Sequence, residues 1–176
     1  MSTREETIPD AMLAELCRRG EVSAYEQLYQ LHGARMKSVA WNMLKNREDA
    51  EDAVQETFVK VSRSAGGFRG NSSFVTWVFR ILVNTCRDAR SRAGRNSEEL
   101  PEEMAGGARA NPVLVVALGR ALEELEPRYR EVFLLAESEG FTHPEIAAIL
   151  NIPEGTSRNW LYEAKKALRE ALKEGQ

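Results

Sequence analysis

Residues 142–168 have the sequence THPEIAAILNIPEGTSRNWLYEAKKAL, which decides the fold of the C-terminal half of the chain. Thr142 and Glu145 have the spacing of a capping box, and this pattern begins a helix. Residues 151–153, Asn-Ile-Pro, end that helix. A second helix follows, and its apolar side is formed by Leu161, Ala164, Leu168 and Leu172. Two short helices joined by a tight break predict a helix-turn-helix motif.

Polar side chains lie opposite the apolar side of the second helix. A helix-turn-helix inserts the early residues of its second helix into the major groove of DNA, so we expect Arg158, Asn159 and Tyr162 to contact base edges. Lys165 and Lys166 are candidates for contacts with phosphates. The alternative is a helical hairpin that binds protein or no partner.

Residues 68–84, FRGNSSFVTWVFRILVN, join a glycine-containing loop to a second amphipathic segment. On a helix that starts near Ser72, one arc is apolar and packs, while a neighbouring arc carries Trp77, Arg80, Asn84, Arg87 and Ser91. Tryptophan offers a flat face to an unpaired base, and arginine and asparagine bind phosphates and base edges. This surface is therefore a candidate site for melted nucleic acid. The alternative is that Trp77 is a core aromatic and the arginines form a solvated face.

The formal net charge of -3 conceals three blocks of different sign. Residues 1–59 carry a net charge of -4, residues 60–95 carry +7, and residues 96–176 carry -6. Like charges crowded on one segment repel, so a cationic segment within an acidic chain favours a local contact with a polyanion. Nucleic acid is the leading candidate.

Amphipathic patterns recur along the 176 residues with almost no strand-like alternation, which predicts an all-α fold of two small helical domains. We expect the domains at residues 1–92 and 112–176, joined by a flexible, acidic linker at residues 93–111. The linker is either a passive tether or, through its glutamates, a mimic of nucleic acid.

No apolar run is long enough for a membrane span, and no export signal begins the chain, so we expect a cytoplasmic protein without membrane insertion. Cys17 and Cys86 lack paired spacing, and His32 and His143 complete no metal or nucleophile set. We expect no metal, no cofactor and no enzymatic activity.

Two helices are expected before the cationic segment. Residues 23–26 have the form of a capping box that begins the first, and Asn46 can cap the second. On the second helix an acidic face carries Glu48, Asp52, Gln55 and Glu56, which suits docking on a basic partner. The alternative is a solvated acidic face.

Three segments, in this order, resemble those of the extracytoplasmic-function sigma factors of bacterial RNA polymerase. Residues 52–60, DAVQETFVK, are similar to the family's polymerase-binding helix, and residues 68–84 are similar to its minus-ten segment. Residues 125–135, LEPRYREVFLL, together with the helix-turn-helix, are similar to its minus-thirty-five domain. The resemblance extends from about residue 21 to residue 172.

The resemblance implies a transcription initiation factor that binds core RNA polymerase, directs it to promoters and helps to melt the minus-ten element by capturing non-template bases. It places the acidic helix on the clamp of the largest polymerase subunit, and it implies an anti-sigma factor as a further partner. By family position, contacts with minus-ten DNA are expected for Phe68, Asn71, Ser72, Ser73, Trp77, Arg80, Asn84 and Arg87.

Three positions of the recognition helix depart from the family pattern. The family commonly has basic residues where this chain has Trp160 and Glu163, and an apolar residue where it has Ser157. The minus-thirty-five sequence preference therefore does not transfer to this chain.

Two other classes of protein are alternatives to this interpretation. A DNA-binding regulator independent of polymerase would use the helix-turn-helix alone, but it leaves the acidic helix and residues 68–84 unexplained. A metal-dependent nuclease would use Glu48, Asp52 and Glu56 as ligands, although carboxylates on one exposed helix lack supporting groups.

Overall fold

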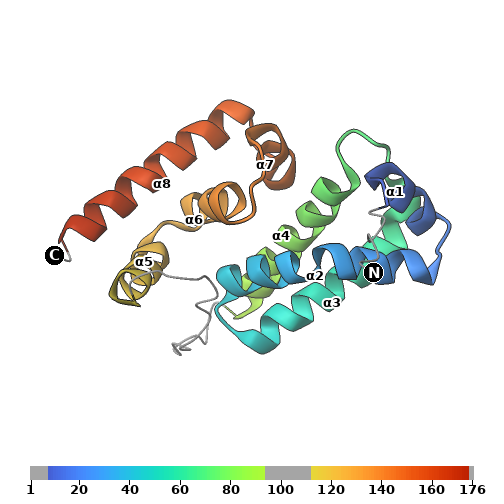
Figure 1. The fold of residues 1–176 in the computed structure, drawn as a ribbon, viewed down its shortest axis with the longest axis horizontal. Coiled ribbons are helices and arrows are strands. Elements are labelled where there is room, and N and C mark those ends of the chain that lie inside the picture. The colour runs from blue at the N-terminus through green and yellow to red at the C-terminus, as the bar shows by residue number, and fades with distance from the viewer. Residues whose placement is uncertain (1–7, 94–111, 175–176) are drawn as a thin grey trace, which may run out of the picture. The chain divides into compact units, whose positions relative to one another are not determined.

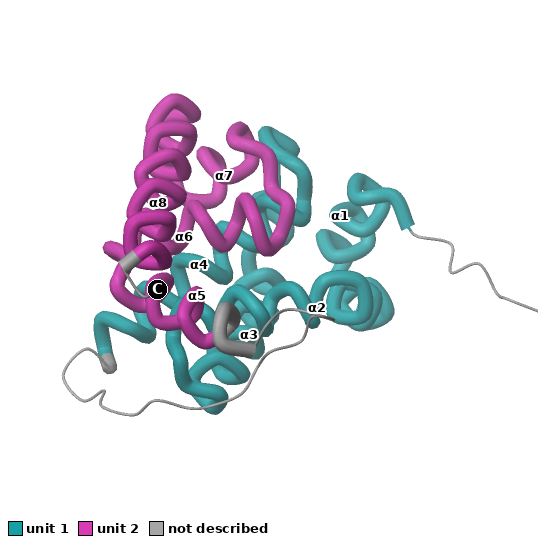
Figure 2. Tube along the Cα trace, turned by 60° about the vertical axis from the view of Figure 1, so that its left-hand side comes forward, with its two compact units in different colours: residues 1–97 teal, residues 98–176 magenta. Residues whose placement is uncertain are grey.

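The structure, a computed structural model, describes residues 8–93 and 112–174 of the chain. The described residues are helical throughout, apart from the connections between helices, so the predicted all-α class with two helical domains is confirmed (Figure 1). The chain divides into two compact units, residues 1–97 and residues 98–176 (Figure 2). Most of the predicted linker, residues 94–111, lies outside the described residues.

Unit 1 contains α1 (Asp10–Arg18), α2 (Val22–Leu44), α3 (Arg47–Ser64), the short 3-10 helix η1 (Ala65–Gly67) and α4 (Phe74–Ala93). The three long helices α2, α3 and α4 pack on one another, and α1 packs against α2, α4 and η1. Their shared core consists of fully buried apolar side chains, among them Leu13, Leu28, Met36, Val61, Phe74, Val78, Phe79 and Leu82. Burial of this apolar surface is the main force that holds the four helices α1, α2, α3 and α4 together.

One predicted helix start in unit 1 is wrong. The chain reverses between α1 and α2 at Gly20, whose φ of +75° is costly for other residues, and the amide of Glu21 donates to the carbonyl of Leu16. This turn begins α2 at Val22, so Ser23 lies inside the helix and does not cap it. Asn46, in contrast, caps α3 as predicted, with its Oδ1 3.0 Å from the amide nitrogen of Asp49.

The two cysteines of the chain lie in unit 1. Both Cys17 and Cys86 are buried. Burial raises the pKa of the Cys17 thiol to about 11, because the thiolate would lose its hydration. The thiol of Cys17 is therefore a packing group at neutral pH.

Unit 2 contains α5 (Pro112–Glu124), α6 (Pro127–Phe133), the π-helical turn η2 (Leu134–Ser138), α7 (His143–Leu150) and α8 (Glu154–Glu174). The predicted helix-turn-helix corresponds to α7 and α8. Glu145 Oε2 accepts from the backbone amide and the hydroxyl of Thr142, at 2.8 and 2.7 Å, which fixes the start of α7. Asn151 ends α7 in the left-handed conformation, with a φ of +56°.

Candidate nucleic-acid interface

The loop at residues 68–73 leads into α4, and its last residue caps that helix. Ser73 Oγ accepts from the amide of Thr76 at 3.0 Å, so α4 begins at Phe74, two residues after the predicted start near Ser72. The amides of Phe74 and Val75 donate to the carboxylate of Asp10, at 2.6 and 3.0 Å. The first three amides of α4 are therefore all satisfied, and two of the acceptors come from a residue of α1.

Three aromatic rings gather where this loop meets α4. The ring centroids of Phe68 and Trp77 are 5.4 Å apart, those of Phe74 and Trp77 are 5.5 Å apart, and those of Phe68 and Phe74 are 5.3 Å apart. Phe74 is fully buried, whereas Phe68 and Trp77 are partly exposed. The cluster is thus anchored in the core of unit 1 and presents two aromatic side chains at the surface.

The polar arc of α4 is at the surface, as its spacing predicts. Arg80 and Asn84 are exposed, and Arg87 is partly buried. On the loop, Asn71 is exposed and Ser72 is partly buried, with its hydroxyl donating to the carbonyl of Ser73 at 3.1 Å. Thr85 and Leu82 of the packing arc are fully buried. One side of α4 therefore holds the core, and the other offers aromatic, amide and cationic groups to a partner.

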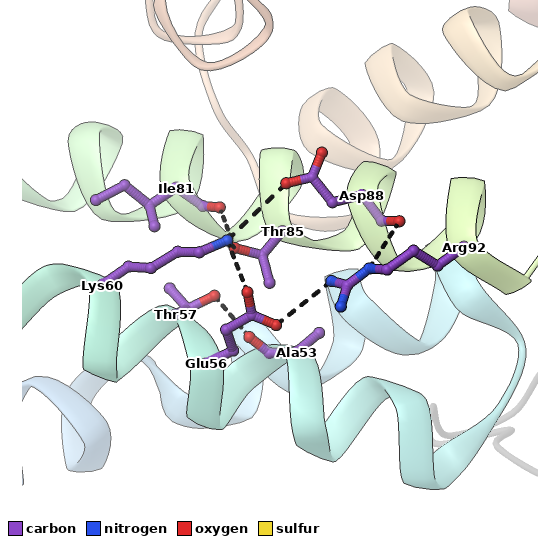
Figure 3. Close-up of polar contacts among 8 residues, drawn as sticks. All are labelled: Ala53, Glu56, Thr57, Lys60, Ile81, Thr85, Asp88 and Arg92. Atoms are coloured by element: carbon purple, nitrogen blue, oxygen red, sulfur yellow. Dashed lines mark hydrogen bonds and ion pairs between the residues drawn. The ribbon is translucent and has the colours of Figure 1, made fainter.

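On α3 the structure separates the four predicted polymerase-binding residues into two groups. Glu48, Asp52 and Gln55 are exposed. Glu56 instead points toward α4. Its carboxylate lies 2.9 Å from Nζ of Lys60, on its own helix, and 3.6 Å from Nη2 of Arg92, on α4 (Figure 3). These cations, above all the hydrogen bond from Lys60, lower the pKa of Glu56.

Lys60 extends the same group of contacts. Its Nζ also donates to Thr85 Oγ1 at 3.0 Å, and the Thr85 hydroxyl donates to the carbonyl of Ile81 at 2.9 Å (Figure 3). Asp88 of α4 lies 3.9 Å from the same Lys60 nitrogen. Helices α3 and α4 are therefore joined by a polar bridge, which we define as Glu56, Lys60, Thr85, Asp88 and Arg92.

In unit 2, most of the predicted DNA-contacting residues of α8 are at the surface. Arg158, Asn159, Tyr162 and Lys166 are exposed. Arg158 forms an ion pair with Glu154 on the same helix. Lys165 is partly buried, and its Nζ lies 2.7 Å from Glu137 Oε1 of η2. Lys166 is therefore more accessible than Lys165 to a partner.

Two of the three residues that depart from the family pattern on α8, Ser157 and Trp160, face the packed side of the helix. Ser157 is fully buried, and its Oγ lies 3.0 Å from His143 Nδ1 at the start of α7. Trp160 is partly buried, with its ring 6.4 Å from that of Tyr129 and 5.7 Å from the guanidinium of Arg128. Ser157 and Trp160 thus connect α8 to its neighbours in unit 2.

Known proteins with the same arrangement identify the family. Residues 28–96 match the family profile described as Sigma-70 region 2, and residues 116–168 match Sigma-70, region 4. RNA polymerase sigma factor CarQ of Myxococcus xanthus is 33% identical over 166 residues, which cover 91% of this chain and 95% of CarQ. The ECF RNA polymerase sigma-E factor of Escherichia coli K12 is 30% identical over 180 residues, covering 93% of this chain and 94% of the relative. This chain belongs to the extracytoplasmic-function sigma factors.

A solved structure supports the same assignment for the sigma factor. CnrH, solved in complex with the cytosolic domain of CnrY, is similar with a TM-score of 0.76 and 27% identity, covering 95% of this chain and 99% of that chain. The resemblance inferred from the sequence is therefore confirmed. The sigma factor directs RNA polymerase to promoters at the initiation of transcription.

Two further features of the sigma factor concern membranes and metal ions. No helix among residues 8–93 and 112–174 is both long and apolar enough to span a bilayer. Within the same residues, no three His, Cys, Asp or Glu side chains are grouped as ligands for a metal ion.

The contacts of Asp10 and Arg18 in this sigma factor were not expected from the sequence. Asp10 lies 64 residues before Phe74, whose amide it binds, and Arg18 Nη2 donates to the carbonyl of Phe68 at 3.1 Å. Both side chains come from α1, which contains none of the motifs on which the family resemblance was based. An aspartate at the start of an amphipathic segment was the available signal, but it indicates a cap for its own helix and not for α4.

Proposed function

We propose that the sigma factor opens promoters by capturing unpaired bases of the minus-ten element on the 68–73 loop and α4. The observation that supports this most strongly is the partly exposed pair Phe68 and Trp77, which is anchored on the buried Phe74. Stacking of a base on an aromatic side chain contributes about 1–3 kcal/mol. That is comparable with the cost of a few kcal/mol for extruding a base from the duplex.

In this mechanism, promoter opening depends on the difference between the affinities of the protein for melted and for paired DNA. The protein favours the melted state only to the extent that it binds the extruded base more tightly than the paired one. Besides Phe68 and Trp77, the contacts with bases and the strand are assigned to Asn71, Ser72, Ser73 and Asn84. Arg80 and Arg87 neutralise phosphates.

The polymerase-binding surface is the exposed acidic face of α3. Glu48, Asp52 and Gln55 are available to a basic partner surface, whereas the charge of Glu56 is shared with Lys60 and Arg92. We therefore assign Glu48, Asp52 and Gln55 to docking on the polymerase clamp and place Glu56 at the edge of that contact.

The second unit recognises the minus-thirty-five element. Arg158, Asn159 and Tyr162 at the start of α8 contact base edges in the major groove, and Lys166 contacts a phosphate, with Lys165 beside it. Residues 1–92 and 112–176 act as separate DNA-binding domains, and residues 93–111 tether them. The tether raises the effective concentration of the second domain once the first has bound.

The sigma factor acts in the cytoplasm with core RNA polymerase, catalyses no bond chemistry itself and is held inactive by an anti-sigma factor. CnrH, a similar protein, was solved in complex with the cytosolic domain of CnrY, which supports a protein partner for this chain.

Run-off transcription with purified core polymerase on a genomic fragment library tests the proposal. The variants are Asp52→Arg, Trp77→Ala and the control Glu26→Gln, an exposed carboxylate on α2. We expect Asp52→Arg to lose association with core polymerase, and Trp77→Ala to retain it but to open promoters poorly. Equal transcript yields from all proteins would count against both roles. Sequence-specific regulation by the isolated chain, without polymerase, would instead support a polymerase-independent regulator.

A further inference from the structure

Helix α1 contacts the base-capturing loop at both of its ends. At the downstream end, the carboxylate of Asp10 accepts from the amides of Phe74 and Val75 at 2.6 and 3.0 Å. At the upstream end, Arg18 Nη2 donates to the carbonyl oxygen of Phe68 at 3.1 Å. Asp10 and Arg18 are the first and last residues of α1, so this one helix spans the loop.

The Arg18 contact is itself supported by neighbouring groups on α1. Glu15 Oε2 lies 2.9 Å from Arg18 Nη1, and Glu15 Oε1 lies 3.0 Å from Arg19 Nε. Leu13, Ala14 and Cys17, on the other face of α1, are buried in the core of unit 1. The backbone of α1 is therefore fixed by packing, and Asp10 and Arg18 project from a rigid element.

Between these two ends, the middle of the loop lies at the surface. Arg69, Gly70 and Asn71 are exposed, and Gly70 has a φ of +73°. Contacts at both ends of a loop limit the shapes that it can adopt, and each residue that becomes ordered costs about 1–2 kcal/mol of conformational entropy. A loop ordered before binding does not pay that cost when the strand arrives.

The charge of Asp10 suits this position for an electrostatic reason. A carboxylate beside a surface that binds a nucleic-acid strand would ordinarily repel phosphates. Here both oxygens of Asp10 accept from amides at the N-terminus of α4, whose helix dipole favours a negative charge. Part of the negative charge is thus compensated by the helix that it caps.

We propose that Asp10 and Arg18 are positioning residues, which hold the 68–73 loop in the shape that captures an unpaired base. Helix α1 then sets the affinity of the sigma factor for the melted minus-ten strand through the loop and not through contact with DNA. This inference rests on the proposed function, because it concerns the same site.

The test uses the full chain in complex with core polymerase and a single-stranded minus-ten oligonucleotide carrying 2-aminopurine. Its sequence is taken from a promoter selected in the run-off screen. The variants are Asp10→Asn, which removes the charge and one acceptor, and Arg18→Gln, which shortens a partly exposed side chain. The control is Glu26→Gln. Binding of each protein to core polymerase and thermal unfolding are measured in parallel.

We expect Asp10→Asn to weaken strand binding by about tenfold and Arg18→Gln by about threefold. Hydrogen bonds to charged groups are stronger than neutral ones, and Asp10 accepts two of them whereas Arg18 donates one to the loop. Affinity for core polymerase should stay within about twofold of the wild type, and Glu26→Gln should match the wild type in both assays. A purely structural role would weaken polymerase and strand binding together.

Three results would overturn the inference. The first is that both variants bind the strand as tightly as the wild type. The second is that each variant loses polymerase binding and strand binding to the same extent. The third applies if Asp10→Asn does not fold, and is that Arg18→Gln binds the strand as tightly as the wild type. Failure of the wild-type holoenzyme to bind the strand is distinguishable from these results, because it contradicts the proposed function and not the role of α1.

Discussion

Substitution of Glu56 separates an internal structural role from a contact with polymerase. Glu56→Gln keeps the shape of the side chain and removes its charge from the ion pairs with Lys60 and Arg92. The side chains of Glu56, Lys60 and Arg92 are 42%, 38% and 67% exposed, so solvent screens both pairs. Each such pair contributes about 0.5 kcal/mol, and their loss destabilises unit 1 by about 1 kcal/mol. In a domain of this size, 1 kcal/mol corresponds to a fall in Tm of about 4–8 °C.

The assay is thermal unfolding of the full chain by calorimetry, at low and at high salt, together with a pull-down on core polymerase. We expect Glu56→Gln to lower the Tm at low salt, to lower it less at high salt, and to retain polymerase binding. The matched substitution Asp52→Asn should leave the Tm nearly unchanged and weaken polymerase binding. An unchanged Tm for Glu56→Gln, together with a loss of polymerase binding as large as that of Asp52→Asn, would contradict an internal role for Glu56.

Three further outcomes are expected. Burial lowers the pKa of His32 from its usual 6.5, so the unfolded chain binds more protons than the folded chain as the pH falls below that value. The wild type should therefore lose stability as the pH falls below about 6.5. In thermal unfolding, His32→Gln should show a smaller loss over the same pH range. Arg130 donates to the carbonyls of Leu122 and Leu125 at 2.7 and 3.1 Å, so Arg130→Ala should destabilise unit 2 by about 2–3 kcal/mol in urea unfolding. Ser157→Ala should lower the free energy of unfolding by about 1 kcal/mol in the same assay. It should lower it by less in a His143→Ala background, because both substitutions remove the same hydrogen bond, between Ser157 and His143.

Features set by local sequence could be predicted. Thr142, Glu145 and Asn151 define the ends of α7 through contacts within a few residues, and the structure has them as expected. The polar arc of α4 followed from helical spacing alone, since most side chains on its other arc, among them Phe74, Val78 and Leu82, are buried. Local pattern failed at Ser23, where a turn at Gly20 begins α2 earlier than the apparent capping box.

Contacts between distant parts of the chain could not be predicted from spacing. The cap that Asp10 provides for α4, and the ion pair between Glu56 and Arg92, depend on how α1, α3 and α4 pack in three dimensions. No periodicity in one sequence encodes which carboxylate will meet which helix end. For this reason the acidic face of α3 was predicted as one surface, although Glu56 points to α4.

The most direct measurement of strand capture is the fluorescence of 2-aminopurine placed in the minus-ten element of a duplex promoter, with core polymerase present. We expect the wild-type holoenzyme to raise the fluorescence as the base leaves the stack. The Trp77→Ala holoenzyme should bind the same promoter, but its equilibrium constant for opening, measured from the fluorescence, should be lower by about tenfold, the equivalent of one lost stacking contact. A full signal from Trp77→Ala, or from the wild-type chain without polymerase, would contradict strand capture by a polymerase-bound sigma factor.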